Sequence, residues 1–266
     1  MRCRALCAGG LPIRGMMPGM TTAMSRGAGQ PDPGGPAVEI LADSGVLAAR
    51  AADLVAGHLT AAAAEQGRAT LAVSGGSTPL PFFAELAGRA VPWEAVHVFQ
   101  VDERVAPAGH PDRNLTGLRS ALLDRVPIPP ENVHPMPVEA DDLEAAAAAY
   151  AGELRAVTGD GRLDVVHLGI GDDGHTASWP PGDPVVDATA DAAVIGPFNG
   201  RRRMTLTPPA VNRAGWIMWE IAGAAKAPIV ARLLAGDPGL PACRVRRHGV
   251  TLLADPGAGA EVEPGA

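Results

Sequence analysis

Short apolar runs alternate with longer helical patterns along residues 38–254 of the chain. The runs 69–73 and 163–168 have the length and the β-branched content of buried strands. The Ala- and Leu-rich segments 46–64 and 143–157 instead place apolar side chains at helical spacing. Strands that alternate with helices indicate a parallel sheet, because a parallel crossover needs a connection of helical length. The pattern therefore predicts a single α/β domain with a doubly wound, mostly parallel Rossmann-like sheet and helices on both faces.

The remaining elements follow from the same pattern and from local signals for helix ends. Asp43 or Ser44 can cap the first helix, and Pro79 and Pro81 are tolerated in the first turn of a helix over 80–86. The other expected strands are 38–41, 96–101, 192–195, 204–206, 216–221 and 250–253, the other expected helices are 114–123, 208–213 and 224–234, and a proline-rich connection covers 127–137.

The two ends of the chain lack this periodicity. Residues 1–36 are rich in Gly, Pro, Met and Arg, and we expect them to form a disordered extension outside the fold, with Met20 or Met24 as the true start. We expect the α/β domain to occupy residues 37–256 and residues 257–266 to form a mobile tail.

Composition limits the partners that the protein can have. The chain of 266 residues is 47% hydrophobic but only 3% aromatic, which favours a core of Ala, Val and Leu, and its formal net charge is −7. The acidic balance argues against nucleic acid as a partner, and an anionic substrate would need a locally basic site. Cys3, Cys7 and Cys243 give neither a disulfide framework nor zinc spacing, and no apolar run approaches the roughly 20 residues of a membrane span. We expect a cytoplasmic protein, a monomer or weak homo-oligomer, that binds no membrane.

The glycine-rich stretch 169–178 carries the strongest candidate for catalysis. It follows a predicted strand, and Gly169 and Gly171 allow a sharp turn at the strand end, where ligands bind in open α/β sheets. Asp173 and His175 lie two positions apart on this turn, so the pair can face a substrate. The simpler alternative is a helix N-cap by Asp173 beside an ordinary surface histidine.

A second motif, Ser74-Gly75-Gly76-Ser77-Thr78-Pro79, connects a predicted strand to a predicted helix. Backbone amides and hydroxyl groups at the positive end of a helix form a ready site for a phosphate. The motif is not a Walker loop, since no Lys follows the glycines, and its glycine spacing differs from the dinucleotide-binding fingerprint. A tight turn that binds nothing is the alternative.

Charged residues also lie at the ends of three further predicted elements. Asp102-Glu103-Arg104 ends one predicted strand, Arg201-Arg202-Arg203 precedes another, and Lys226 begins a helix. A lysine at the N-terminal turn of a helix opposes the helix dipole, so we expect an anion beside Lys226. Solvated surface charges are the alternative for each of the three.

In this order, the motifs resemble those of the 6-phosphogluconolactonase family, within the larger superfamily of glucosamine-6-phosphate deaminase and ribose-5-phosphate isomerase. The resemblance covers about residues 38–254. The motifs that carry it are Ser74-Gly75-Gly76-Ser77-Thr78-Pro79, Asp102-Glu103-Arg104 with His110-Pro111-Asp112-Arg113-Asn114, Asp173-Gly174-His175-Thr176-Ala177-Ser178, Arg203-Met204-Thr205-Leu206-Thr207 and Ala224-Ala225-Lys226-Ala227.

The resemblance implies hydrolysis of 6-phospho-D-glucono-1,5-lactone, a phosphorylated sugar lactone, to 6-phosphogluconate in the oxidative pentose phosphate pathway, without a metal or organic cofactor. His175 would be the general base that takes a proton from water, and Arg104 with loop amides would stabilise the oxyanion. Asp102 and Asp173 would orient the histidine or hold sugar hydroxyls. The residues expected to bind the substrate phosphate are Gly75, Gly76, Ser77, Thr78, Arg203 and Lys226.

The sequence also departs from the family pattern, and other functions stay open. Arg113 replaces a common Ser, Trp179-Pro180 replaces Leu-Phe, and Ala224 replaces Glu. Glucosamine-6-phosphate deaminases, which are aldose-ketose isomerases, share the fold. They typically have Asp-Glu-Tyr where this chain has Asp102-Glu103-Arg104, so that a Tyr stands in place of Arg104. A non-catalytic phosphosugar-binding module and a hydrolase with Ser74 as nucleophile are the remaining alternatives, although the latter lacks the Gly-x-Ser-x-Gly elbow.

Overall fold

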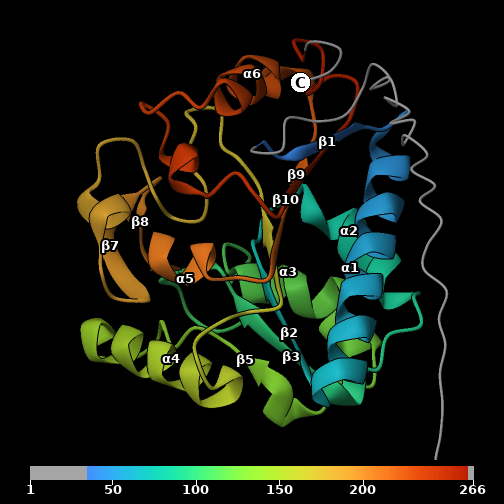
Figure 1. Cartoon of the computed structure of the whole chain (residues 1–266). Helices are drawn as coiled ribbons and strands as arrows, with labels where there is room; N and C mark the ends of the chain where they lie inside the picture. The colour runs from blue at the N-terminus through green and yellow to red at the C-terminus, as the bar shows by residue number, and fades with distance from the viewer. Residues whose placement is uncertain (1–34, 263–266) are drawn as a thin grey trace, which may run out of the picture. The chain divides into compact units, whose positions relative to one another are not determined.

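Seven parallel strands form the central sheet of the computed structural model, which describes residues 35–262 (Figure 1). The order across the sheet is β1-β10-β9-β6-β2-β3-β5, and each neighbouring pair is parallel. The predicted parallel α/β fold is confirmed. The strands of this sheet are β1 (Ala37–Ile40), β2 (Ala69–Val73), β3 (Val96–Gln100), β5 (Val133–His134), β6 (Val165–Leu168), β9 (Trp216–Ile221) and β10 (Val250–Ala254).

Helices cover both faces of the sheet and enclose two hydrophobic cores. They are α1 (Ser44–Gln66), α2 (Pro79–Ala87), α3 (Asn114–Ala121), α4 (Leu143–Thr158), α5 (Pro208–Asn212) and α6 (Ala227–Ala235), with short 3-10 helices at Trp93–Ala95, Leu123–Arg125, Pro130–Asn132, Pro184–Asp187, Ala224–Lys226 and Pro241–Arg244. Side chains alternate between the two faces along β2. Leu71 and Val73 belong to the core with α1, α2 and α3, whereas Ala72 belongs to the core with α4, α5 and α6.

Three strands outside the central sheet form a separate antiparallel sheet in the order β4-β8-β7. They are β4 (Asp102–Arg104), β7 (Ala192–Phe198) and β8 (Arg201–Leu206). The sequence pattern locates β7 and β8 but does not separate them from the central sheet. Val101 is the residue at which the chain leaves the central sheet. Its amide donates a hydrogen bond to the Val73 carbonyl of β2, while its own carbonyl accepts one from the Leu206 amide of β8. The residues after β3 therefore pass from one sheet to the other.

α1 is long and apolar enough, by length and composition, to cross a membrane. Its buried side chains, including Leu47, Val55 and Leu59, nevertheless pack in the core that it shares with α2. Asp43, one of the two predicted caps, accepts a hydrogen bond from the Val46 amide at 2.8 Å. In this structure α1 is a core helix.

The packed part of the chain extends beyond the expected C-terminal boundary. Residues 1–34 and 263–266, which include most of the predicted extension and part of the predicted tail, lie outside the described residues. Residues 256–261 form turns, and Ala258 is fully buried. Part of the predicted tail therefore packs against the domain.

Candidate active site

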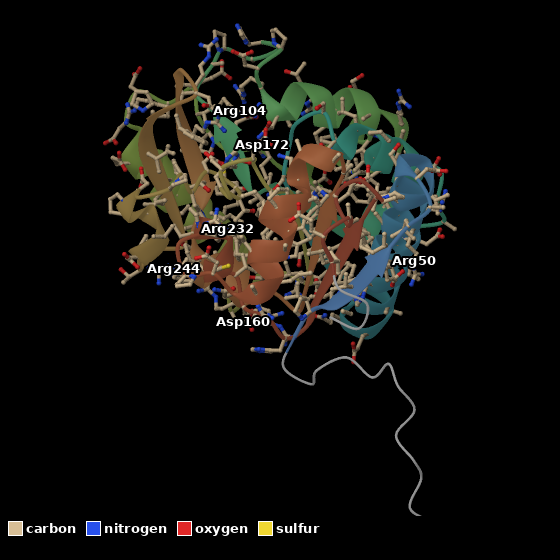
Figure 2. All side chains as sticks on the ribbon, turned by 90° about the horizontal axis from the view of Figure 1, so that it is seen from above. Arg50, Arg104, Asp160, Asp172, Arg232 and Arg244 are labelled. Atoms are coloured by element: carbon tan, nitrogen blue, oxygen red, sulfur yellow. The ribbon has the colours of Figure 1, made fainter. Side chains whose placement is uncertain are left out.

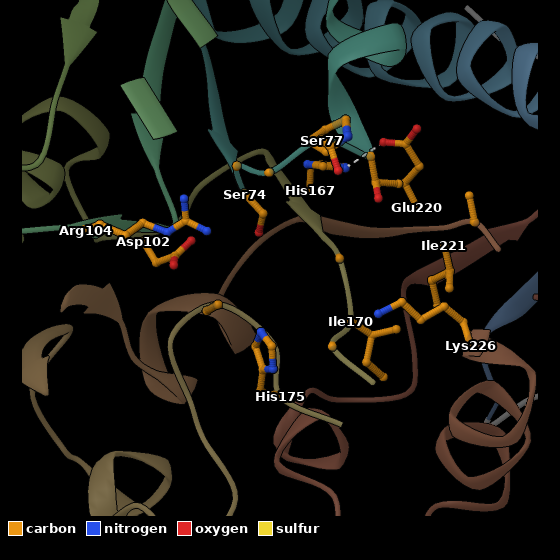
Figure 3. Close-up of a pocket in the computed structure, with 18 of the residues that line it drawn as sticks. Ser74, Ser77, Asp102, Arg104, His167, Ile170, His175, Glu220, Ile221 and Lys226 are labelled. Carbon is orange, nitrogen blue, oxygen red and sulfur yellow. Dashed lines mark hydrogen bonds and ion pairs between the residues drawn. The ribbon is translucent and has the colours of Figure 1, made fainter. Parts of the chain in front are cut away.

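A pocket of about 240 Å³ opens at the carboxyl edge of the central sheet (Figure 3). Its walls come from the loops after β2, β6 and β9 and from β4 and β8 of the second sheet. Nine of the ten predicted site residues line the pocket, and the tenth, Asp173, contacts His175, which does. The structure therefore brings the five motifs together where parallel strands end.

His175 is held by the tight turn that follows β6. The Gly171 amide donates to the His175 carbonyl at 2.8 Å, and Gly174, with a φ of +83°, donates its amide to the Gly171 carbonyl. A Cβ at residue 171 would lie 2.0 Å from His175 Nδ1. Glycine is therefore required at this position so that the backbone can approach the imidazole ring.

Asp173 fixes the orientation of the His175 ring. Its Oδ1 accepts hydrogen bonds from His175 Nδ1 at 2.5 Å and from the His175 amide at 3.1 Å. Nε2 then has no hydrogen-bond partner within residues 35–262, and the ring lines the pocket. Burial raises the pKa of Asp173, but the hydrogen bonds from His175 outweigh this effect and hold the pKa below its ordinary value. The alternative of an N-cap is wrong, because no helix begins at Asp173.

Phe198 contacts the same imidazole ring from the β7–β8 hairpin. The two rings meet edge to face, with centroids 4.9 Å apart and an interplanar angle of 83°. The guanidinium of Arg203 lies 4.9 Å from the centroid of the Phe198 ring, and its Nε donates to the Phe198 carbonyl at 3.2 Å. The hairpin therefore connects His175 to Arg203, a contact that no sequence motif indicated.

Asp102 lies in the pocket wall, but no hydrogen bond joins it to His175. Its Oδ2 accepts a hydrogen bond from the Ser178 hydroxyl at 2.7 Å and lies 3.7 Å from Arg203 Nη1. The side chain is only 7% exposed. The sequence left the roles of two carboxylates unresolved, and the structure distinguishes their contacts: Asp173 binds the histidine, whereas Asp102 binds Ser178 and Arg203.

The charged triplet 102–104 is largely buried, so a solvated loop is the wrong interpretation. Glu103 is fully buried and accepts hydrogen bonds from the amides of the first two residues of α3, at 2.7 and 2.9 Å. Its Oε2 also lies 3.2 Å from the Nε of Arg113, the residue that departs from the family pattern. Arg104 lines the pocket, and its Nε is buried without a hydrogen-bond partner within the described residues. Glu103 thus anchors α3, while its two neighbours face the pocket.

The loop of residues 75–78 leads from Ser74, which follows β2, into α2 with its backbone amides free. The amides of residues 75–78 donate to no acceptor within residues 35–262. A Cβ at Gly75 would lie 2.1 Å from the Asn114 side chain, and Gly76 has a φ of +114°. Free amides at a helix N-terminus are a common phosphate site. The loop therefore has the geometry that a phosphate site needs.

Two cations of the predicted phosphate site reach the pocket from different elements. Lys226 Nζ lies 2.6 Å from Asp172 Oδ1, and the Asp172 side chain is 74% exposed. Asp172 is labelled in Figure 2. The anion expected beside Lys226 is thus a carboxylate of the chain itself. Arg203 is buried in the pocket wall, whereas Arg201 and Arg202 form ion pairs at the surface. Only Arg203 of this triplet lines the pocket, at the position that the family motif indicated.

Sequence reasoning missed a buried acid and base in the same pocket. His167 on β6 and Glu220 on β9 are 1% and 3% exposed, and their Nε2 and Oε2 atoms are 3.0 Å apart. Both side chains line the pocket. The only available signal was one polar residue within each of the apolar stretches 165–168 and 216–221.

The pocket is lined by groups that are chemically able to bind an anion and by an imidazole that is able to accept a proton. The loop 75–78 and Lys226 can bind a phosphate group, and His175 Nε2 can take a proton from a water molecule. Residues 35–262 contain no group of three or more His, Cys, Asp or Glu side chains placed to hold a metal ion. A reaction without a metal or cofactor stays a prediction.

Known proteins resemble the chain in both sequence and fold. The family described as "Glucosamine-6-phosphate isomerases/6-phosphogluconolactonase" matches residues 42–253. The curated 6-phosphogluconolactonase of Nostoc sp. is 39% identical over 234 residues, which are 85% of this chain and 98% of the relative. That of Mycobacterium leprae is 36% identical over 215 residues, which are 76% of this chain and 87% of the relative.

Solved structures share the fold. The crystal structure of 6-phosphogluconolactonase from Thermotoga maritima has a TM-score of 0.76 and 27% identity, and the match covers 83% of this chain and 99% of that one. A monomeric glucosamine-6-phosphate deaminase has the same TM-score of 0.76 at 21% identity, with 85% of this chain and 99% of that one covered. At that identity the likeness to the deaminase concerns the fold alone.

Proposed function

The chain belongs to the family of glucosamine-6-phosphate isomerases and 6-phosphogluconolactonases, and from this membership we propose that it hydrolyses 6-phospho-D-glucono-1,5-lactone to 6-phospho-D-gluconate with His175 as the general base. Curated relatives at 36% and 39% identity are lactonases. The chain is accordingly a 6-phosphogluconolactonase of the pentose phosphate pathway.

Hydrolysis starts at C1 of the lactone, an activated ester that needs no covalent nucleophile. His175 Nε2 takes a proton from a water molecule as the water oxygen attacks C1. The tetrahedral intermediate collapses when the bond between C1 and the ring oxygen breaks, and the imidazolium returns its proton to that oxygen. The carboxylic acid formed at C1 then ionises, so each turnover consumes one water and releases one proton at neutral pH.

Asp173 and Arg104 support the charges that develop during this step. Because the Asp173 carboxylate accepts the hydrogen bond from Nδ1, the basic lone pair of His175 is on Nε2, and the carboxylate stabilises the imidazolium that forms. The oxyanion at C1 needs donors that are already in place. Arg104, whose Nε is buried without a partner in the described part of the chain, is the candidate donor, together with loop amides.

The phosphate group on C6 anchors the substrate away from the reacting carbon. The amides of Gly75 and Gly76 and the hydroxyls of Ser77 and Thr78 are the donors of the loop, and Lys226 exchanges its contact with Asp172 for the phosphate. Arg203 stays a predicted phosphate ligand. Binding at this remote group holds C1 against the histidine and thereby contributes to the rate.

The observation that carries the proposal is the free Nε2 of His175, held by Asp173 in the pocket that also contains the loop 75–78. The test is the disappearance of freshly generated 6-phosphogluconolactone, corrected for spontaneous hydrolysis. His175→Ala should lower kcat/KM by about 10² to 10⁴-fold with little change in Tm. His248→Ala, which removes an exposed histidine outside the pocket, is the matched control and should retain full activity.

Two outcomes would contradict the proposal in different ways. If His175→Ala and the parent had equal activity, His175 would not be the general base. Release of ammonia from glucosamine 6-phosphate, without hydrolysis of the lactone, would instead assign the pocket to the deaminase reaction.

A further inference from the structure

His167 and Glu220 form a buried acid and base pair in the wall of the pocket, and Figure 3 shows them on the opposite side of the pocket from His175. His167 Nε2 lies 3.0 Å from Glu220 Oε2, and the two side chains are 1% and 2% exposed. Neither residue takes part in the proton transfer by His175 or in the binding of the phosphate. Both nevertheless line the space that the substrate would occupy.

Packing alone gives no reason for this pair. The imidazole of His167 packs against two aromatic rings of α2, with its ring centroid 5.0 Å from that of Phe82 and 6.1 Å from that of Phe83. Met218, two residues before Glu220 on the same face of β9, belongs to the apolar core. Two apolar side chains would fit these surroundings, whereas a buried carboxylate and imidazole must first lose their hydration.

The two carboxylate oxygens of Glu220 have different surroundings. Oε2 accepts the hydrogen bond from His167. Oε1 accepts no hydrogen bond within residues 35–262, although the side chain lines the pocket. An ionised carboxylate accepts hydrogen bonds and donates none. Glu220 therefore presents an unused acceptor, and its partner must be a donor that enters the pocket.

We propose that Glu220 accepts a hydrogen bond from a hydroxyl group of the sugar lactone, and that His167 is the positioning residue that holds the carboxylate for this contact. The inference rests on the proposed function, because the C2, C3 and C4 hydroxyls of that lactone supply the donors. Phe82 and Phe83 fix the imidazole ring, and its Nε2 fixes Oε2. The pair thereby selects a hydroxylated sugar over one that lacks the hydroxyl, since Oε1 of Glu220 would then be buried under the substrate without a donor.

The test compares two variants with the parent on four substrates. His167→Leu/Glu220→Leu removes both partners at once, so that no unpaired charge is left buried. Met218→Leu changes the same face of β9 outside the pocket and is the matched control. The substrates are 6-phosphogluconolactone and its 2-deoxy, 3-deoxy and 4-deoxy forms, each generated from the corresponding sugar phosphate immediately before use.

For the parent and for Met218→Leu, kcat/KM on the deoxy lactone that lacks the contacted hydroxyl should be about 10- to 100-fold lower than kcat/KM on 6-phosphogluconolactone. His167→Leu/Glu220→Leu should hydrolyse that deoxy lactone as fast as the parent does, and should no longer distinguish it from the complete substrate. Its Tm should stay close to that of the parent. If the parent and the double variant instead differ by one common factor on all four lactones, the pair has only a structural role and the inference is wrong.

His167 acts through Glu220, so its own test needs a conservative variant. His167→Gln keeps an N–H group that can donate to the carboxylate and should keep the discrimination between the lactones. His167→Leu should lose it, and circular dichroism shows whether this variant is folded. Equal discrimination by folded His167→Leu and the parent would overturn the positioning role. If the parent hydrolyses none of the four lactones, the proposed function fails, which is a different result from a parent that hydrolyses them without discrimination.

Discussion

Asp173 and Asp102 are the two acidic residues of the predicted catalytic set, and their surroundings differ. The Asp173 side chain is 43% exposed and bonds to His175, whereas that of Asp102 is 7% exposed and bonds to Ser178. A carboxylate bonded to an imidazole determines which ring nitrogen is basic. A buried carboxylate beside Arg203 instead balances a cation whose pKa is lowered by burial. Substitution of Asp173 should therefore act on the chemical step, and substitution of Asp102 on the wall of the pocket.

The stability of the Asp173→Asn variant should depend on pH in a defined direction. The pKa of Asp173 in the folded protein lies below its ordinary value, so the ionised carboxylate stabilises the fold above the unfolded pKa of about 3.9. This contribution is lost as the pH falls through the lower folded value. Asp173→Asn should therefore have a lower Tm than the parent at pH 7, and the two Tm values should converge below about pH 4. Thermal unfolding followed by circular dichroism between pH 7 and pH 3 measures this, and a Tm difference that stays constant over that range would contradict it.

Among the elements, the loop between β2 and α2 depends most directly on glycine. A Cβ at Gly75 would lie 2.1 Å from the side chain of Asn114, the first residue of α3. Gly75→Ala must therefore displace either the loop or α3, and we expect a raised KM for the lactone together with a lower Tm. Gly152→Ala is the matched control, because nothing lies within 4 Å of a Cβ at that helical position. The control should be more stable than the parent by about 0.4 to 1 kcal/mol.

Steady-state kinetics and thermal unfolding of both glycine variants decide this prediction. A Gly75→Ala protein with the KM and the Tm of the parent would mean that the loop tolerates a side chain, and the close approach to Asn114 would then have no part in binding the phosphate.

The elements of the central sheet could be predicted because their apolar runs are long and regular. β9 has the predicted bounds of 216–221, and β2 those of 69–73. The strand β5, Val133–His134, could not be predicted, because it consists of two residues inside a proline-rich connection. The second sheet was also missed, since β4 is a charged triplet whose burial depends on hydrogen bonds from α3 and on pairing with β8. Such pairing joins residues about a hundred positions apart, and no local pattern carries it.

The same limit applies to the candidate site. Local motifs identified residues such as His175 and Lys226, because glycine spacing and strand ends are visible in the sequence. The roles of these residues stay predictions. His167 and Glu220 were missed because each is a single polar residue in an apolar strand, and only the adjacent positions of β6 and β9 bring them together. Phe198 was missed because its contact with His175 depends on how the β7–β8 hairpin folds over the pocket.

The whole molecule carries a formal net charge of −7, although its proposed substrate is an anion. The long-range field therefore opposes association. Arg104, Arg203 and Lys226 line the pocket and supply positive charge at short range. Such charges act within about one Debye length, roughly 8 Å at physiological ionic strength. Capture of the substrate should thus depend on direct contacts in the pocket rather than on electrostatic steering from a distance.

The two ends of the chain should differ in what their removal does to the whole molecule. β1 begins at Ala37 and pairs with β10, so a chain shortened to residues 35–266 keeps the complete sheet. At the other end, Asp255 accepts hydrogen bonds from the amides of Gly223 and Ala258, and a Cβ at Gly257 would lie 2.9 Å from the Ala224 amide nitrogen. The C-terminal turns therefore pack against the turn that precedes Lys226.

We expect the chain of residues 35–266 to match the parent in Tm and in kcat/KM. A chain that ends at residue 256 loses the buried Ala258 and the packing of residues 257–262, so its Tm should fall by roughly 2 to 4 °C for each kcal/mol of stability that is lost. Its KM should also rise, because the turn that carries Lys226 is then less restrained, while kcat stays closer to that of the parent. Differential scanning calorimetry and lactone kinetics on the three chains measure both effects. If the chain that ends at 256 keeps the Tm and the KM of the parent, residues 257–262 belong to a dispensable tail, as their composition alone suggests.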